Sequence, residues 1–129
     1  PVHPPAGDNE PRHTPIEDLE PLDDAEVVMR GLIKNLTSPE WGVQMEALNN
    51  MRALSIYHAS ETILPRLHDV VRASLLVVDN LRSQLSKAAI MSITDMIRYL
   101  KHQMDPELDG LVTMMVKKAT ETSGFIAEE

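Results

Sequence analysis

From Asp23 onward, the sequence repeats one arrangement: a helix start signal, then apolar residues three or four positions apart. Ser38-Pro39 and Asp105-Pro106 each place a capping residue before a proline, which suits the first turn of a helix. The apolar residues that follow such a signal form one hydrophobic stripe per helix. No segment of the sequence shows the alternation with period two that predicts a strand. The chain is therefore predicted to be all-α.

Five helices are expected, each after a capping residue or a turn, in the order Asp23, Ser38, Ser60, Asp79 to Ser83, and Asp105. The first is predicted to run from about Asp24 to Thr37, and the second to end near His58. Pro65 lies early in the third helix and should bend it, because proline removes one backbone hydrogen bond. The connections are short, so consecutive helices should be antiparallel neighbours that form pairs.

The spacing of these pairs favours a solenoid. The first, third and fifth helices begin about 37 and about 45 residues apart, which brackets the HEAT and armadillo period. We predict an α-solenoid of HEAT-type antiparallel helix pairs, with a simple up-down bundle as the alternative. Residues 122–129 resemble a turn that leads into a sixth helix, so the third pair is expected to be incomplete. We therefore expect a longer protein, whose remaining repeats are partners of this chain.

Residues 1–22 differ in composition from the rest of the chain. They contain six of the nine prolines together with acidic residues, and such a segment buries too little apolar surface to order itself. We predict an acidic proline-rich linker over residues 1–22 and a partial HEAT-like or TOG-like helical domain over residues 23–129. The segment from Ile16 to Leu22 has enough apolar residues to lie along the edge of that domain, which is the alternative to disorder.

The net charge of −8 lies mainly in the leading segment. Residues 1–26 carry eight acidic residues against Arg12, whereas residues 27–129 carry twelve acidic and eleven basic residues. Neither part has the basic surface that nucleic-acid binding requires. No apolar run approaches the length needed to cross a bilayer, so neither nucleic acid nor a membrane is an expected partner. The absence of cysteine excludes disulfides and thiolate zinc sites and favours a reducing, intracellular setting.

No catalytic constellation can be assembled from this sequence, so the chain is predicted not to be an enzyme. Two histidines lie in the leading segment, and His58, His68 and His102 have no partner at i+4 that would form a helical metal pair. Neither a glycine-rich phosphate loop nor a nucleophile elbow occurs. No cofactor and no metal are therefore expected. The eight methionines suit either a hydrophobic core or an adaptable peptide groove.

Two turns place binding-type side chains on the loop edge of the expected pairs. Trp41, the only tryptophan, begins the second helix, and Arg82 lies 41 residues later at the matching position before the fourth, with Lys87 one or two turns on. Matching turns of stacked repeats lie along one edge. Tryptophan and arginine are enriched at binding hot spots, so this edge is a candidate site. In the alternative, Trp41 packs inward between repeats and Arg82 pairs with Asp79.

Three stretches of the sequence resemble a known family. They are Ser38-Pro39-Glu40-Trp41 with Ala47-Leu48-Asn49-Asn50-Met51-Arg52-Ala53-Leu54, then Asn80-Leu81-Arg82-Ser83-Gln84-Leu85-Ser86-Lys87-Ala88-Ala89, and Val116-Lys117-Lys118-Ala119 with Ser123-Gly124-Phe125-Ile126-Ala127-Glu128. Together they resemble the first half of a TOG domain, with the crescerin family of ciliary TOG-array proteins as the nearest likeness and the CLASP family next. The likeness covers about residues 24–129.

This resemblance implies a function. TOG domains of those families are flat paddles of six HEAT repeats that bind tubulin through the loops inside each repeat. The resemblance puts Trp41 in the first loop, Arg82 and Ser83 with nearby Lys87 at the second, and Ser123, Gly124 and Phe125 at the third. It implies a module that binds tubulin or the microtubule lattice and regulates ciliary or axonemal microtubules, in the cytoplasm and cytoskeleton. A HEAT scaffold that binds another protein and not tubulin is the alternative.

Overall fold

The computed structural model describes the backbone of residues 10–127 and the side chains of residues 10–121. Within these residues, the α-helices are α1 (Ala25–Leu36), α2 (Trp41–Tyr57), α3 (Leu67–Val78), α4 (Ser83–Leu100) and α5 (Leu108–Ala127). The 3-10 turns are η2 (Ile16–Asp18), η3 (Leu64–Arg66) and η4 (Lys101–Glu107). No strand occurs between residues 10 and 127. The predicted all-α class is confirmed.

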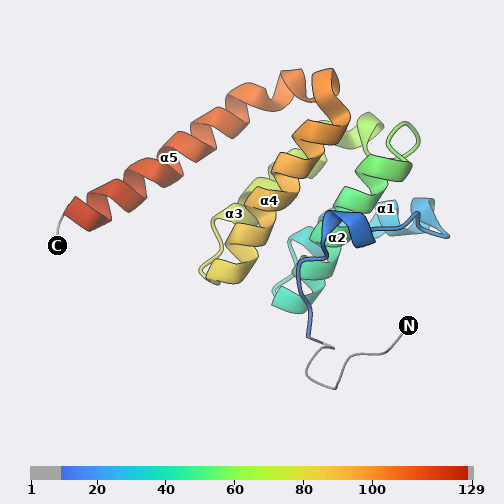
Figure 1. The fold of residues 1–129 in the computed structure, drawn as a ribbon, viewed down its shortest axis with the longest axis horizontal. Helices are drawn as coiled ribbons and strands as arrows, with labels where there is room; N and C mark the ends of the chain where they lie inside the picture. Colours follow the sequence, from blue (N-terminus) through green and yellow to red (C-terminus); the bar gives the residue numbers. More distant parts are fainter. Residues whose placement is uncertain (1–9, 128–129) are drawn as a thin grey trace.

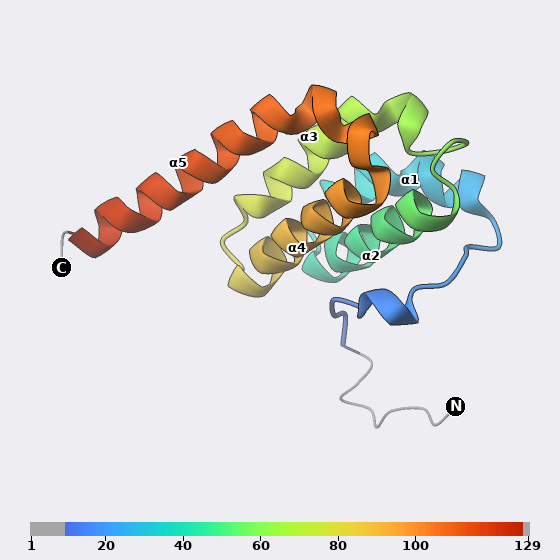
Figure 2. The same ribbon diagram turned by 45° about the horizontal axis from the view of Figure 1, so that its top comes forward.

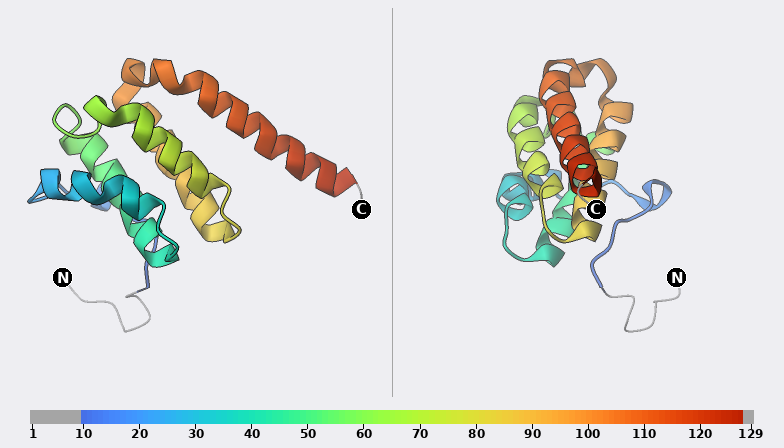
Figure 3. Two further views of the ribbon diagram at one scale, coloured as in Figure 1. Left: turned by 180° about the vertical axis from the view of Figure 1, so that it is seen from behind. Right: turned by 90° about the vertical axis from the view of Figure 1, so that its left-hand side faces the viewer.

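The first four helices form two antiparallel pairs. α1 packs against α2 and α3 packs against α4, while α2 also packs on α4 and α1 on α3. As a result, α1 and α3 form one layer and α2 and α4 form the other (Figures 1 and 3). This is the arrangement expected of stacked HEAT-type pairs.

A core of aliphatic residues and methionines holds the two pairs together. Fully buried members come from all four helices and include Leu36, Leu48, Met51, Val78, Leu85 and Ile93. Full burial of one such side chain stabilises the fold by about 1.5 to 3 kcal/mol. Five of the eight methionines are buried, namely Met29, Met45, Met51, Met96 and Met104. Most methionines are therefore core residues.

Three helix starts differ from the sequence expectation. α2 begins at Trp41 with Glu40 as its N-cap, so Ser38 and Pro39 lie in the turn ahead of the helix. Pro65 does not bend α3 but lies in η3, ahead of the helix, where its fixed φ angle and missing N–H are tolerated. α4 ends at Leu100, and Lys101 then has a φ of 52°, a left-handed conformation that turns the chain into η4. The signal Asp105-Pro106 consequently lies in a 3-10 turn, and α5 begins at Leu108.

The expected turn over residues 122–129 is wrong for the part that the structure describes, because α5 continues as a helix to Ala127. Each further helical residue adds a backbone hydrogen bond, and a helix tolerates a single glycine, which costs about 1 kcal/mol relative to alanine. Leu111 near the start of α5 is buried in the core and Met114 packs against it, whereas the far end of the helix lies apart from α3 and α4 (Figures 1 and 3).

Residues 10–22 lie against α2 on the outer side of the α2 and α4 layer (Figure 2). Leu19 is buried there, with 8% of its surface exposed. The described part of the leading segment thus differs from a disordered linker and follows the alternative expected for Ile16 to Leu22. A segment of this composition is ordered because α2 supplies its hydrogen-bond partners. The remainder of the expected linker, residues 1–9, lies outside the described residues.

Candidate functional site

The turn between α1 and α2 and the turn between α3 and α4 lie at the same end of the two pairs (Figures 1 and 3). Residues of both turns line one open depression of about 510 Å³. We refer to this surface, residues 38–41 and 79–83, as the loop edge. Its two turns are matching elements of consecutive helix pairs, as the solenoid period predicts.

The first turn of the loop edge is fixed by two side chains. Ser38 Oγ accepts a hydrogen bond from the Glu40 N–H at 3.1 Å. Gln44 is buried, and its Nε2 donates to the Leu36 carbonyl at 3.0 Å, which satisfies one of the free acceptors at the end of α1. Both contacts hold the start of α2 against the end of α1, and Trp41 is the first residue of α2.

The second turn is fixed in the same way. Asn80 Oδ1 accepts a hydrogen bond from the Arg82 N–H at 2.8 Å, two residues later, as Ser38 does for Glu40. Ser86 Oγ donates to the Val78 carbonyl at 2.6 Å and ties the first turn of α4 to the end of α3. Arg82 therefore has a defined backbone position at the N-cap of α4.

Trp41 and Arg82 stack on each other across the two turns. The guanidinium carbon of Arg82 lies 4.6 Å from the centre of the Trp41 ring, a cation–π distance. Trp41 is half-buried and also packs against the hydrophobic core, so part of the inward-packing alternative holds as well. Asp79 pairs with Lys118 of α5, with 3.7 Å between Oδ1 and Nζ. The alternative pairing of Arg82 with Asp79 is therefore replaced by the stack on Trp41.

The other site residues expected from the sequence lie at different distances from this stack. Ser83 and Lys87 are exposed and line a neighbouring depression of about 640 Å³ between α4 and Lys118. Ser123, Gly124 and Phe125 belong to the last turns of α5, which returns toward the end of the pairs that carries the loop edge and whose Lys118 pairs with Asp79 there (Figure 1). Their side chains lie outside the described residues.

The depression between the two turns of the loop edge is also lined by four residues that were not expected as site residues from the sequence: Pro39, Gln44, Asn80 and Leu81. Leu81 is fully exposed, which is unusual for a large apolar side chain in a folded domain. The spacing of Ser38 to Glu40 and of Asn80 to Arg82 is the signature of side-chain turns, and could have located both loops more closely. The combination of an indole, a cation and an exposed leucine suits protein binding.

Among residues 10–121, whose side chains the structure describes, no group of three acidic or histidine side chains is arranged to hold a metal ion. No helix of this part of the chain is both long and apolar enough to span a bilayer.

Comparisons with known proteins identify relatives of the chain. It is 34% identical over 125 residues to the human protein named TOG array regulator of axonemal microtubules protein 1, and 35% identical over 112 residues to the mouse protein of that name. It is 27% identical over 109 residues to the crescerin-like protein che-12 of Caenorhabditis elegans.

These alignments cover 97%, 87% and 84% of the chain but 7%, 6% and 8% of the three relatives. The chain thus spans less than a tenth of the length of the curated relatives it matches. No protein-family profile and no solved structure match the chain. Two of the relatives carry the term TOG array in their names and the third is described as crescerin-like. Over most of its length, the chain is therefore homologous to the crescerin family of TOG-array proteins.

Proposed function

We propose that the loop edge binds tubulin, free or in the microtubule lattice, and that the chain acts as a TOG-type module in the regulation of ciliary or axonemal microtubules. The homology to proteins named as regulators of axonemal microtubules supports this proposal. The observation that carries it is the stack of Arg82 on Trp41, which joins two consecutive helix pairs in one exposed unit. The proposed role is binding and involves no catalytic step.

The stack gives the loop edge two properties that binding needs. It holds the long side chain of Arg82 in place before a partner arrives, so that less conformational entropy is lost on association. It also leaves a delocalised cation next to an exposed apolar surface, and such a surface suits an acidic partner such as tubulin. The proposed contact residues are Trp41, Arg82, Ser83 and Lys87. From the family resemblance, Ser123, Gly124 and Phe125 are proposed as further contacts, since they lie one to two turns beyond Lys118, which pairs with Asp79 of the loop edge.

A scaffold that binds another protein and not tubulin is the second candidate. Two observations favour it: residues 27–129 have nearly balanced charge, and Leu81 offers the loop edge a fully exposed apolar side chain. Weak electrostatic steering and an apolar contact suit a neutral partner as well as an acidic one.

Two binding measurements separate these functions. Cosedimentation with taxol-stabilised microtubules tests binding to the lattice, and size-exclusion chromatography with soluble tubulin tests binding to the free dimer. The proposal predicts that the chain moves with tubulin in at least one of them, and that Arg82→Glu reduces the bound fraction. Arg98→Glu is the matched control, since it makes the same charge change on an exposed residue at the other end of α4. Failure to move with tubulin in both measurements would favour the scaffold.

A further inference from the structure

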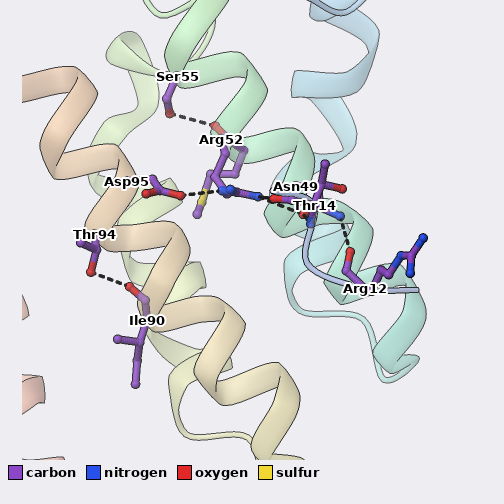
Figure 4. Close-up of polar contacts among 9 residues, drawn as sticks. Arg12, Thr14, Asn49, Arg52, Ser55, Ile90, Thr94 and Asp95 are labelled. Carbon is purple, nitrogen blue, oxygen red and sulfur yellow. Dashed lines mark hydrogen bonds and ion pairs between the residues drawn. The ribbon is translucent and has the colours of Figure 1, made fainter. Parts of the chain in front are cut away.

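The segment that crosses α2, residues 12–22, is held mainly through its main chain. We refer to it as the strap. Asn49 of α2 contacts it twice: Nδ2 donates to the Arg12 carbonyl at 2.9 Å, and Oδ1 accepts the Thr14 N–H at 3.0 Å (Figure 4). One side-chain amide thereby bonds a carbonyl and an N–H, two residues apart, on the same edge of the strap, as a neighbouring strand would.

Arg52 continues this contact one helical turn further along α2. Its Nη1 donates to the Thr14 carbonyl at 2.7 Å and its Nε donates to Asp95 Oδ2 of α4 at 2.9 Å (Figure 4). Only 1% of the Arg52 side chain is exposed. The carboxylate of Asp95 thus fixes a buried guanidinium in the orientation that presents a donor to the strap.

The second half of the strap is held in the same manner at the end of α2. Tyr57 Oη donates to the Leu19 carbonyl at 2.9 Å, and His58 Nε2 accepts the Leu22 N–H at 3.0 Å. Every one of these contacts involves a backbone group of the strap and a side chain of α2 or of its C-cap. Backbone recognition of this kind does not depend on the sequence that is bound.

The side chains of the strap contribute little by comparison. Leu19 is buried, whereas Pro15, Glu17, Asp18, Glu20 and Pro21 are exposed. Leu22 is partly buried and packs against the hydrophobic core, so recognition rests on the main chain and on two leucines. An open depression of about 360 Å³ continues past Pro11 and His13 toward Met91 of α4, so the surface extends beyond the segment that now lies on it.

We propose that the outer face of α2 is a binding groove for an extended peptide with two leucine-sized side chains, and that the strap occupies this groove in cis. The defining residues of the groove are Asn49, Arg52, Tyr57 and His58. The partner it fits is a segment of another chain that is extended on both sides of a short turn, as the strap is around η2. Such a segment binds when it displaces the strap.

The test uses the full chain and a labelled probe peptide with the sequence of residues 10–24. In the unaltered chain, the strap competes at an effective concentration in the millimolar range, so the probe should bind weakly. Leu19→Ala weakens the strap and leaves the groove intact. Because more of the groove is then open, the probe should bind to this variant about tenfold more tightly or better, as measured by fluorescence anisotropy.

Three controls make the result specific. Glu17→Ala changes an exposed residue of the strap and should leave the affinity for the probe as in the unaltered chain. A probe peptide that carries alanine at the position of Leu19 should lose most of its affinity for the Leu19→Ala chain. Adding Asn49→Ala to the Leu19→Ala chain removes the amide that holds the peptide backbone, and should abolish binding of the probe.

The proposal is wrong if the Leu19→Ala chain melts cooperatively and takes up no more probe than the unaltered chain, because the strap is then a fixed part of the fold. Hydrogen exchange of the unaltered chain gives a second test that needs no substitution. The amides of Thr14 and Leu22 should exchange faster than those in the middle of α2, since the strap opens on its own. Equal protection of these amides and of the buried turns of α2 would also overturn the proposal.

Discussion

Two arginines in matching helix pairs occupy opposite environments. Arg52 of α2 is buried between α4 and the strap and bonds to both, whereas Arg82 is exposed at the loop edge and lies over the ring of Trp41. Loss of a buried, fully bonded charge leaves its partners without a counter-charge in a region of low dielectric. Loss of an exposed one leaves groups that water can solvate. The strap face should therefore control stability, and the loop edge should control binding.

The largest expected effect is that of Arg52→Ala on stability. The change leaves Asp95 and the Thr14 carbonyl without their donor and opens a cavity next to α4. We expect a loss of about 3 kcal/mol or more in the free energy of unfolding, measured by urea denaturation. Arg98→Ala, at an exposed position of α4, should change it by less than about 0.5 kcal/mol. A loss below about 1 kcal/mol for Arg52→Ala would remove the distinction between the two arginines.

The next largest effect is that of Trp41→Ala on binding. We expect a loss of about 2 kcal/mol in the free energy of tubulin binding, since the indole is the centre of the proposed contact. The loss of folding stability should stay below the 3 to 5 kcal/mol that is typical of a fully buried tryptophan, because Trp41 is half-buried. Tyr99→Ala is the matched aromatic control at the far end of α4, and should leave tubulin binding unchanged. Loss of the cooperative melting transition in Trp41→Ala would show that Trp41 is a core residue.

A smaller effect is expected for Arg82→Glu, and it should depend on salt. The charge reversal should slow association with tubulin by roughly tenfold at low ionic strength and by less at higher ionic strength, because salt screens exposed charges. Stopped-flow measurements at two salt concentrations test this, with Arg98→Glu as the control. The same loss at both concentrations would mean that Arg82 acts through packing and not through charge.

The smallest effect concerns His13, a half-buried residue of the strap near Arg52. Burial and, to a lesser degree, the Arg52 guanidinium lower the pKa of His13 below its usual value of 6.5, against a smaller opposing effect of Asp95. The unfolded chain therefore binds more protons than the folded chain once the pH falls below about 6.5, so this contribution is fully present above that pH and is lost below it.

His13→Asn should accordingly flatten the dependence of unfolding free energy on pH between about 7.5 and 5.5, measured by urea denaturation at several pH values. An unchanged slope for His13→Asn would show that proton binding by His13 is not linked to the packing of the strap on α2.

The helical pairs could be predicted from the sequence because their determinants are local. Ser38-Pro39 and the apolar stripe of each helix lie within the segment that they specify, and the period of the repeat then placed Trp41 and Arg82 on the same edge. Their direct stacking could not be predicted, because it depends on the rotamers of two side chains and on the distance between neighbouring helices.

The strap was harder to predict because its order comes from distant residues. Its own composition favours disorder, and the groups that hold it, such as Asn49 and Tyr57, lie 35 to 38 residues away from their partners in the sequence. The prediction of a turn near the end of α5 was wrong for the opposite reason. Ser123 and Gly124 are local turn signals, but turn propensity alone does not end a helix whose neighbouring residues continue it.

The most direct test of the separation between the two regions is one titration of soluble tubulin with three forms of the chain, each checked by its melting curve. The unaltered chain should bind tubulin saturably. Leu19→Ala, which loosens the strap, should keep that affinity, and Arg82→Glu should lose most of it without a change in melting temperature. Absence of saturable binding of the unaltered chain to soluble tubulin together with absence of cosedimentation with microtubules, or an equal loss of affinity in both variants, would contradict the assignment of the loop edge as the tubulin-binding surface.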